Sequence, residues 1–190
     1  MRSQHIPMTI EQYHLLPLKP GWKREYIDGE AHIQPRNTAA TLTISVGPRP
    51  VNASYPLREV TPEDAPALIA AFYEAFRDTC EYCDWPDAKI RESASKCITT
   101  FFAGQRGETH SASRLAVETA TATGREEVIG AALLVRDNDG PYLDMLFVRP
   151  HWQRRGLATA LVSAAMNALH AAGEPTLRSA YDIANDPSVA

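Results

Sequence analysis

The sequence predicts an α/β fold of the α+β kind, in which a mixed, mostly antiparallel sheet is flanked by helices and preceded by a hairpin extension. Two observations predict the sheet and one predicts its main helix. Residues 127–136 and 142–148 are rich in apolar residues typical of strands, and the tight-turn sequence Asp-Asn-Asp-Gly at 137–140 separates them. Such a turn pairs its two strands antiparallel. Apolar residues recur at spacings of three and four over residues 156–172, which indicates an amphipathic helix.

The first 46 residues predict a small ordered extension. Thr9 is suited to cap a short helix over residues 10–16, which Pro17 would end. The Asp28-Gly29 pair is a strong hairpin signal, because both central residues of such a turn need a positive φ. Residues 41–46 alternate polar and apolar side chains and form a third strand-like run. So short a segment buries little surface by itself, so we expect it to dock on the rest of the chain.

A proline-rich stretch over residues 47–56 is interpreted as a linker. We therefore expect a helix and hairpin extension with its linker over residues 1–50 and a second domain over residues 51–190. In the second domain a strand is expected at 57–60, a helix after Thr61-Pro62, and another helix at 87–102. The remaining strands are expected at 114–119, 127–136, 142–148 and 177–183, with Gly173 ending the helix before the last of them.

Composition excludes several classes of protein. The formal net charge is −4 and the hydrophobic fraction is 44%, which argues against a general nucleic-acid or membrane-surface binder and against wholesale disorder. No apolar run is long enough to cross a bilayer, and the first residues do not resemble a signal peptide. We therefore expect a cytoplasmic protein without nucleic-acid or membrane partners. Three cysteines do not make a disulfide framework, and Cys80 and Cys83 lack the further ligands that structural zinc needs, so no metal is expected.

The segment over residues 146–161 carries the clearest chemical signal. It consists of a strand end, a short donor-rich loop and the start of an alanine-rich helix. The first turn of a helix has no internal acceptors for its amides, so the amides from Arg154 to Ala158 are expected to be free. Free amides at the positive end of a helix dipole bind anions. Gly156 permits a sharp bend, Ala158 permits close approach of a ligand, and Arg154 and Arg155 add positive charge.

This segment resembles the signature of the GNAT (Gcn5-related N-acetyltransferase) family. The family pattern, Gln/Arg-x-x-Gly-x-Gly/Ala after a strand ending in Val-x-Pro, stands here as Gln153-Arg154-Arg155-Gly156-Leu157-Ala158 after Val148-Arg149-Pro150. The resemblance extends over about residues 56–190. It implies a GNAT-like, V-splayed sheet that binds acetyl-CoA as co-substrate and passes the acetyl group to an amine of a small molecule or peptide. The residues that it implies for acetyl-CoA binding are Leu146, Phe147, Val148, Gln153, Arg154, Arg155, Gly156, Leu157, Ala158, Thr159 and Asn185.

Two carboxylates are candidates for acid–base catalysis. An alkylamine has a pKa near 10.4 and is mostly protonated at neutral pH, so a group must take its proton, directly or through water. Strand alternation places Asp144 on the same face as Tyr142 and Leu146, where its carboxylate could receive that proton through a water molecule; the alternative is a structural acceptor or a charge that orients the substrate. Glu118, near the end of the preceding strand, is the second candidate. The oxyanion would need a backbone donor near Val148.

The resemblance also implies a general-acid tyrosine and two further strands beyond Asn185-x-x-Ser188, so the domain looks short at its C-terminal end. We accordingly expect an exposed sheet edge and impaired catalysis. The alternative function is then a CoA-binding or interaction module completed by a partner chain, and a homodimer is possible. The hairpin over residues 22–34 could instead lie on the exposed edge. The strings at 8–13 and 26–30 are weakly similar to the start of Uma2-type domains, and we interpret them as an appended hairpin.

Overall fold

The computed structural model describes residues 4–17, 22–35, 39–79, 82, 85–119 and 124–182. Its main element is a seven-stranded sheet in which six strands follow the order β4-β10-β9-β8-β7-β5, and β6 pairs with β8 off this path. Every pairing in it is antiparallel except β9 with β10. The strand bounds are β4 Ala39–Ser45, β5 Leu57–Glu59, β6 Glu108–Thr109, β7 Arg114–Thr119, β8 Glu126–Asp137, β9 Gly140–Val148 and β10 Thr176–Asp182.

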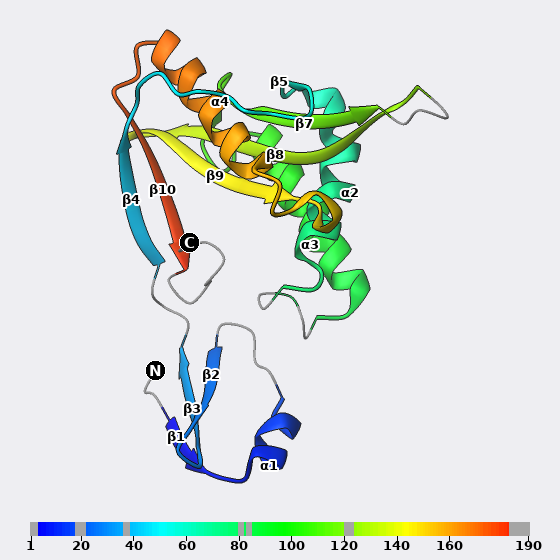
Figure 1. Cartoon of the computed structure of the whole chain (residues 1–190), viewed down its shortest axis with the longest axis vertical. Helices are drawn as coiled ribbons and strands as arrows, with labels where there is room; N and C mark the ends of the chain where they lie inside the picture. Colours follow the sequence, from blue (N-terminus) through cyan, green and yellow to red (C-terminus); the bar gives the residue numbers. More distant parts are fainter. Residues whose placement is uncertain are drawn as a thin grey trace.

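Helices cover both faces of this sheet (Figure 1). Helices α2 (Ala65–Phe76) and α3 (Asp87–Phe102) pack on one face through a core that includes Phe72, Phe101 and Leu133. Helix α4 (Leu157–Ala171) packs on the other face through a second core that includes Ile129 and Leu161. Strand β8 supplies both cores because successive side chains of a strand point to opposite faces. The predicted fold class is confirmed. No helix in the described part of the chain is long and apolar enough to span a membrane.

The parallel pair β9–β10 opens into the expected V. The two strands pair only where Arg178 meets Tyr142 and Ser179 meets Leu143, at the start of β9. Beyond that point β9 runs on towards α2 and α3, whereas β10 turns away with β4, as Figure 1 shows. Helix α4 joins the end of β9 to the start of β10 and so returns the chain to the closed end of the V.

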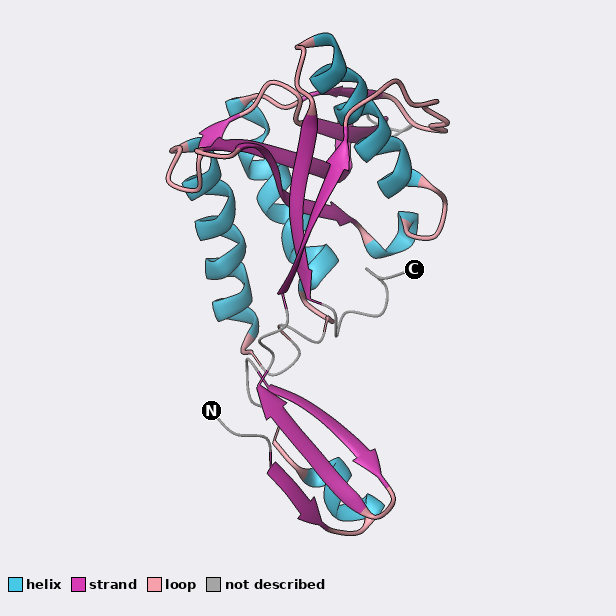
Figure 2. Ribbon diagram, turned by 90° about the vertical axis from the view of Figure 1, so that its left-hand side faces the viewer, coloured by secondary structure: helices cyan, strands magenta, loops and turns pink. Residues whose placement is uncertain are grey.

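The N-terminal residues form a separate small sheet. Strands β1 (Gln4–Pro7), β3 (Glu30–Pro35) and β2 (Trp22–Ile27) pair in the order β1-β3-β2, with helix α1 (Ile10–Leu15) beside them (Figure 2). The predicted hairpin turn is confirmed, with φ at +49° for Asp28 and +85° for Gly29. The alternative in which this hairpin lies on the edge of the large sheet is wrong, because β2 and β3 pair only with each other and with β1 among the described residues.

Strand β4 covers the sheet edge that was expected to be exposed. All seven of its residues pair antiparallel with β10, from Ala39 opposite Asp182 to Ser45 opposite Thr176. Ile44 lies opposite Leu177, and both contribute to the core under α4. The prediction of an open edge at β10 is therefore wrong. The expected domain boundary at residue 50 leaves β4 in the extension, although β4 belongs to the large sheet.

Candidate functional site

The loop before α4 presents a row of backbone amides to solvent. After the short 3₁₀ turn η2 (Pro150–Trp152), the chain takes positive φ values at Arg154 (+61°) and at Gly156 (+76°), which is the N-cap of α4. The first helical hydrogen bond runs from the Ala160 N–H to the Gly156 carbonyl, so the preceding helical amides have no acceptor in the helix. Within the described part of the chain, the backbone N–H groups of residues 154–159 donate to no other residue. A backbone that alternates between negative and positive φ turns successive N–H groups towards one point, which makes a concave anion site.

Side-chain contacts fix the two ends of this loop. The Gln153 Nε2 donates to the Val148 carbonyl at 2.9 Å, which ties the loop back to the end of β9. The Arg155 Nη1 donates to the Tyr55 hydroxyl at 3.2 Å. Leu157 is buried in the core under α4, and Trp152 packs against the same core. Because both ends are held, the exposed residues between them keep their amides pointing outward.

A second set of backbone donors lies at the open edge of β9, inside the V. The Arg149 N–H donates to the Ile129 carbonyl, and these two residues lie opposite each other in the β8–β9 register. Hydrogen-bonded and non-hydrogen-bonded pairs alternate in an antiparallel ladder. The backbone groups of Leu146 and Val148 therefore point away from β8, towards the side from which β10 has diverged. Leu146 is also 38% exposed, which is unusual for a leucine in the middle of a sheet.

Phe147 differs from its two neighbours. The same alternation directs its backbone groups to β8. Its side chain is buried in the core under α2 and α3, where its ring centroid lies 5.6 Å from that of Phe72 and 6.3 Å from that of Phe76. The structure thus brings Leu146 and Val148 to the open edge of β9 and leaves Phe147 in the core.

Asp144 lies at an irregularity of β9. Leu133 pairs with Met145 and Leu134 with Leu143, so Asp144 is the extra residue of a β-bulge. The bulge breaks the alternation: Tyr142 packs on the core under α2 and α3, as Met145 and Phe147 do, so Leu146 belongs to the opposite face. The prediction that Asp144 shares a face with both Tyr142 and Leu146 is therefore wrong.

An arginine from the loop after α3 neutralises this carboxylate. The Arg106 Nε and Nη2 each donate to one Asp144 oxygen at 2.7 Å, and the Asp144 side chain is only 7% exposed. The hydrogen bond to Asp144 raises the pKa of the Arg106 guanidinium above its usual range. A carboxylate whose two oxygens both accept hydrogen bonds from a permanent cation is held in one position as a hydrogen-bond acceptor.

The other predicted residues lie apart from Asp144. Glu118 is on β7, opposite Glu127 of β8, whereas Asp144 is level with Leu133 and Leu134. Six residues along a strand correspond to about 20 Å, so the structure does not bring the two carboxylates together. Asn185, Cys80 and Cys83 lie outside the described residues.

Arg149 is a structural residue of the site that the sequence reasoning did not single out. Its guanidinium is buried and forms ion pairs with Glu127 of β8 and, at 3.3 Å, with Glu74 of α2. These contacts hold the end of β9 between the sheet and α2, directly before the anion-binding loop. The sequence shows an arginine at the variable position of the Val-x-Pro segment, but only the fold shows that two carboxylates bind it.

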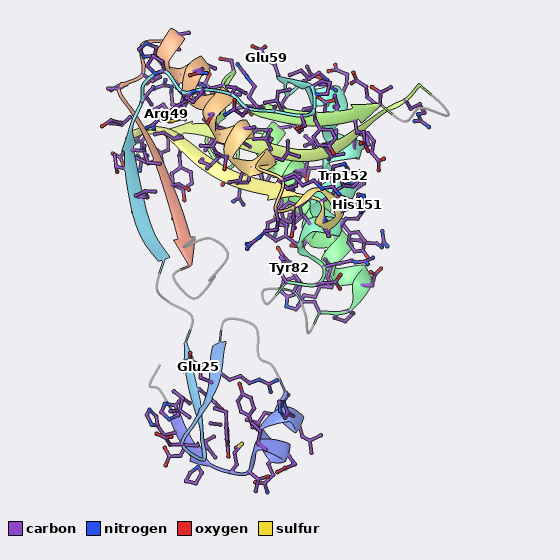
Figure 3. All side chains as sticks on the ribbon, viewed as in Figure 1. Glu25, Arg49, Glu59, Tyr82, His151 and Trp152 are labelled. Carbon is purple, nitrogen blue, oxygen red and sulfur yellow. The ribbon has the colours of Figure 1, made fainter. Side chains whose placement is uncertain are left out.

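A hollow of about 520 Å³ lies beside this point, on the side of α2 and α3. Figure 3 shows His151 and Trp152 of η2 next to the two helices. The hollow is lined by η2, by α2 with its C-cap Arg77, and by one residue of α3: Ala70, Tyr73, Glu74, Arg77, Arg91, Pro150, His151 and Trp152. Arg77 pairs with Asp78 and Arg91 with Asp87, so the cations of the lining are already partnered.

Comparison with known proteins connects these features with one family. The model of the acetyltransferase (GNAT) domain family matches residues 56–190, which is more than half of the chain. No curated protein matches the sequence. Among solved structures, the PaiA N-acetyltransferase from Thermoplasma acidophilum in complex with coenzyme A has a TM-score of 0.53 at 18% identity, over 72% of this chain and 85% of that one.

A GCN5-related N-acetyltransferase from Sphaerobacter thermophilus gives a TM-score of 0.51 at 19% identity, over 95% of this chain and 50% of that one. At these identities the two structures show a shared fold. The free amides before α4 and the open edge of β9 therefore lie in a domain of acetyltransferase architecture.

Proposed function

The chain belongs to the GNAT acetyltransferase family, and we propose that it is an N-acetyltransferase that moves an acetyl group from acetyl-CoA to an amine of a small molecule or peptide. The observation that carries this proposal is the presence of two sets of free backbone donors near each other in the chain: the amides of residues 154–159 before α4 and those of Leu146 and Val148 at the open edge of β9. The first set suits a diphosphate, and the second suits an extended chain that contains amides. Acetyl-CoA has both in one molecule.

The residues present fit this co-substrate. The amides of residues 154–159 and the Arg154 side chain would hold the pyrophosphate, and the Leu146 and Val148 backbone would pair with the pantetheine arm. The same two residues carry N–H groups that point into the V, where one of them would donate to the oxyanion that forms at the thioester carbonyl. The Thermoplasma protein of the same fold was crystallised with coenzyme A.

The proposed reaction is a direct transfer. The free amine nitrogen attacks the thioester carbonyl carbon, so that a C–N bond forms, the C–S bond breaks and the electron pair of that bond leaves with sulfur. The amine loses a proton to water or to a side chain that water connects to it, and the CoA thiolate gains one. Backbone donors are suited to the oxyanion because they are already oriented before the charge develops.

Binding and turnover can be tested separately. Acetyl-CoA and CoA should each raise the melting temperature of the full chain, because a ligand that binds only the native state stabilises it. Release of free thiol from acetyl-CoA should then increase above the background rate with at least one member of a panel of amines and N-terminal peptides. Stabilisation without thiol release across the panel would identify a CoA-binding module without turnover, and no stabilisation by either ligand would contradict the proposed site.

We further propose that Asp144 orients the amine and does not itself remove the proton. Both of its oxygens accept hydrogen bonds from Arg106, so proton uptake would have to break a bidentate ion pair. The Asp144→Asn variant should therefore lower the transfer rate by about tenfold or less and leave the shape of the pH–rate profile unchanged. A general base contributes about 10²- to 10⁴-fold. A loss of that size, together with disappearance of the acidic limb of the profile, would assign the base to Asp144.

A further inference from the structure

Three side chains of the N-terminal sheet converge on one face of β1 and β3. The β1–β3 register places His5 directly opposite His32. Glu30 precedes His32 by two residues on β3, and residues two apart on a strand share a face. All three lie in the three-stranded sheet β1-β3-β2, outside the family match over residues 56–190, so this cluster shares no strand or helix with the acetyl-CoA site.

The distances between these side chains suit a shared ion. The Glu30 Oε2 lies 3.8 Å from the His5 Nδ1 and 3.9 Å from the His32 Nε2. The candidate ligand atoms of the three residues all lie within 4.8 Å of one another. Two ligands of a tetrahedral zinc ion stand ~3.4 Å apart, given bonds of about 2.0–2.1 Å. Small rotations of these side chains would close the difference, and solvent leaves room for them because His5 is 56% and Glu30 40% exposed.

The donor set selects the class of ion. Two imidazole nitrogens and one carboxylate oxygen suit zinc and its neighbours in the first transition row, whereas calcium and magnesium prefer oxygen ligands alone. Three protein ligands leave a fourth position for water. We propose that His5, Glu30 and His32 bind one divalent transition-metal ion, with Zn²⁺ as the representative case.

The three-stranded sheet has too small an apolar core to be stabilised by burial alone, so a bound metal ion would add to its stability. Among the described side chains of residues 5–17 and 24–33, only that of Ala31 is buried. Ile10, Leu15 and Ile27 are all exposed. A unit with so small a core gains little from apolar burial, and small units of this kind commonly depend on a metal or another cross-link. An ion between His5 and His32 would fasten the four-residue β1 to β3, its only pairing partner in the described part of the chain.

The test is a titration of the full chain, freed of any polyhistidine tag and stripped with EDTA. We expect calorimetry to show one equivalent of Zn²⁺ bound, and Co²⁺ to give a visible absorption band without the near-ultraviolet band of a thiolate ligand. Removal of one ligand in the Glu30→Gln or His32→Ala variant should weaken Zn²⁺ binding at least tenfold. His14→Ala is the matched control, because His14 is an exposed histidine of the same unit that lies on α1. It should bind as the wild type does.

Two outcomes would overturn the proposal. The first is the absence of saturable Zn²⁺ binding by the wild-type chain, which requires no variant to fold. The second is equal binding by the triple variant His5→Ala, Glu30→Gln, His32→Ala, which would place the ion elsewhere. The Cys80→Ser, Cys83→Ser variant removes the two cysteines that could bind zinc in place of the histidines, and it should retain Zn²⁺ binding. Acetyl-CoA binding is an independent readout, so failure of the metal site leaves the proposed transferase function untouched.

Discussion

Replacement of Gly156 by Asp should reduce the affinity for acetyl-CoA by about 100-fold or more, which corresponds to about 2.7 kcal/mol. Gly156 is the N-cap of α4, at the centre of the row of free amides. A carboxylate there would place a negative charge where we propose that the pyrophosphate binds, and it would compete for the same N–H groups. Calorimetry with CoA measures the loss directly, and the double variant Arg154→Glu, Gly156→Asp should abolish binding.

The matched control for this variant is Gly173→Asp. Gly156 and Gly173 share a φ of +76°, and a Cβ built at either position meets no atom within 4 Å. The two substitutions therefore impose the same backbone strain without a steric clash. Gly173 lies beyond the opposite end of α4, so its variant should bind acetyl-CoA as the wild type does. Equal loss of binding in both variants would indicate a general effect on folding and would contradict the proposed pyrophosphate site.

Local signals in the sequence were sufficient for most of the secondary structure. The Asp28-Gly29 turn, the Thr9 cap and the helix over residues 87–102 each depend on side chains within a few positions, and the structure confirms all three. Strand β1 was missed because four residues ending in Pro7 are too few to show an alternating pattern. Strand β6, with two residues, was missed for the same reason.

The errors at the site have a different origin, since they concern partners far apart in the sequence. The anion-binding loop could be predicted because a helix start and its glycine are contiguous. The bulge at Asp144 could not, because an inserted residue leaves the strand-like composition intact while it reverses the direction of the side chains. Arg106 lies 38 residues before Asp144, and no local pattern connects the two.

Strand pairing explains why the histidine cluster was also missed. His5 and His32 lie far apart in the sequence and meet only through the β1–β3 register, which no local spacing of histidines indicates. Likewise, residues 41–46 were predicted as a strand, but the alternation of polar and apolar residues does not indicate which strand is its neighbour. The pairing of β4 with β10 therefore needs a direct test.

Two proline substitutions at neighbouring positions of β4 provide that test. The Val46 N–H donates to the Pro175 carbonyl, and by alternation Leu42 forms a hydrogen-bonded pair with Ser179. The N–H of Thr43 then points to the outer edge. Leu42→Pro should destabilise the chain by about 2–4 kcal/mol, because it removes a ladder bond and places the proline ring against the β10 backbone. Thr43→Pro should cost only about 1 kcal/mol, since prolines are tolerated on the outer side of an edge strand.

Urea unfolding of the two variants distinguishes the possible pairings. Both positions are exposed, so neither substitution removes much apolar burial. Light scattering should also show association of Leu42→Pro, because loss of β4 uncovers the edge of β10. A register shifted by one residue would reverse the order of the two variants, since it exchanges inward and outward N–H groups. Equal and small effects would mean that β4 does not pair with β10. Strand β10, which forms one side of the V at the acetyl-CoA site, would then have no neighbouring strand on its outer edge.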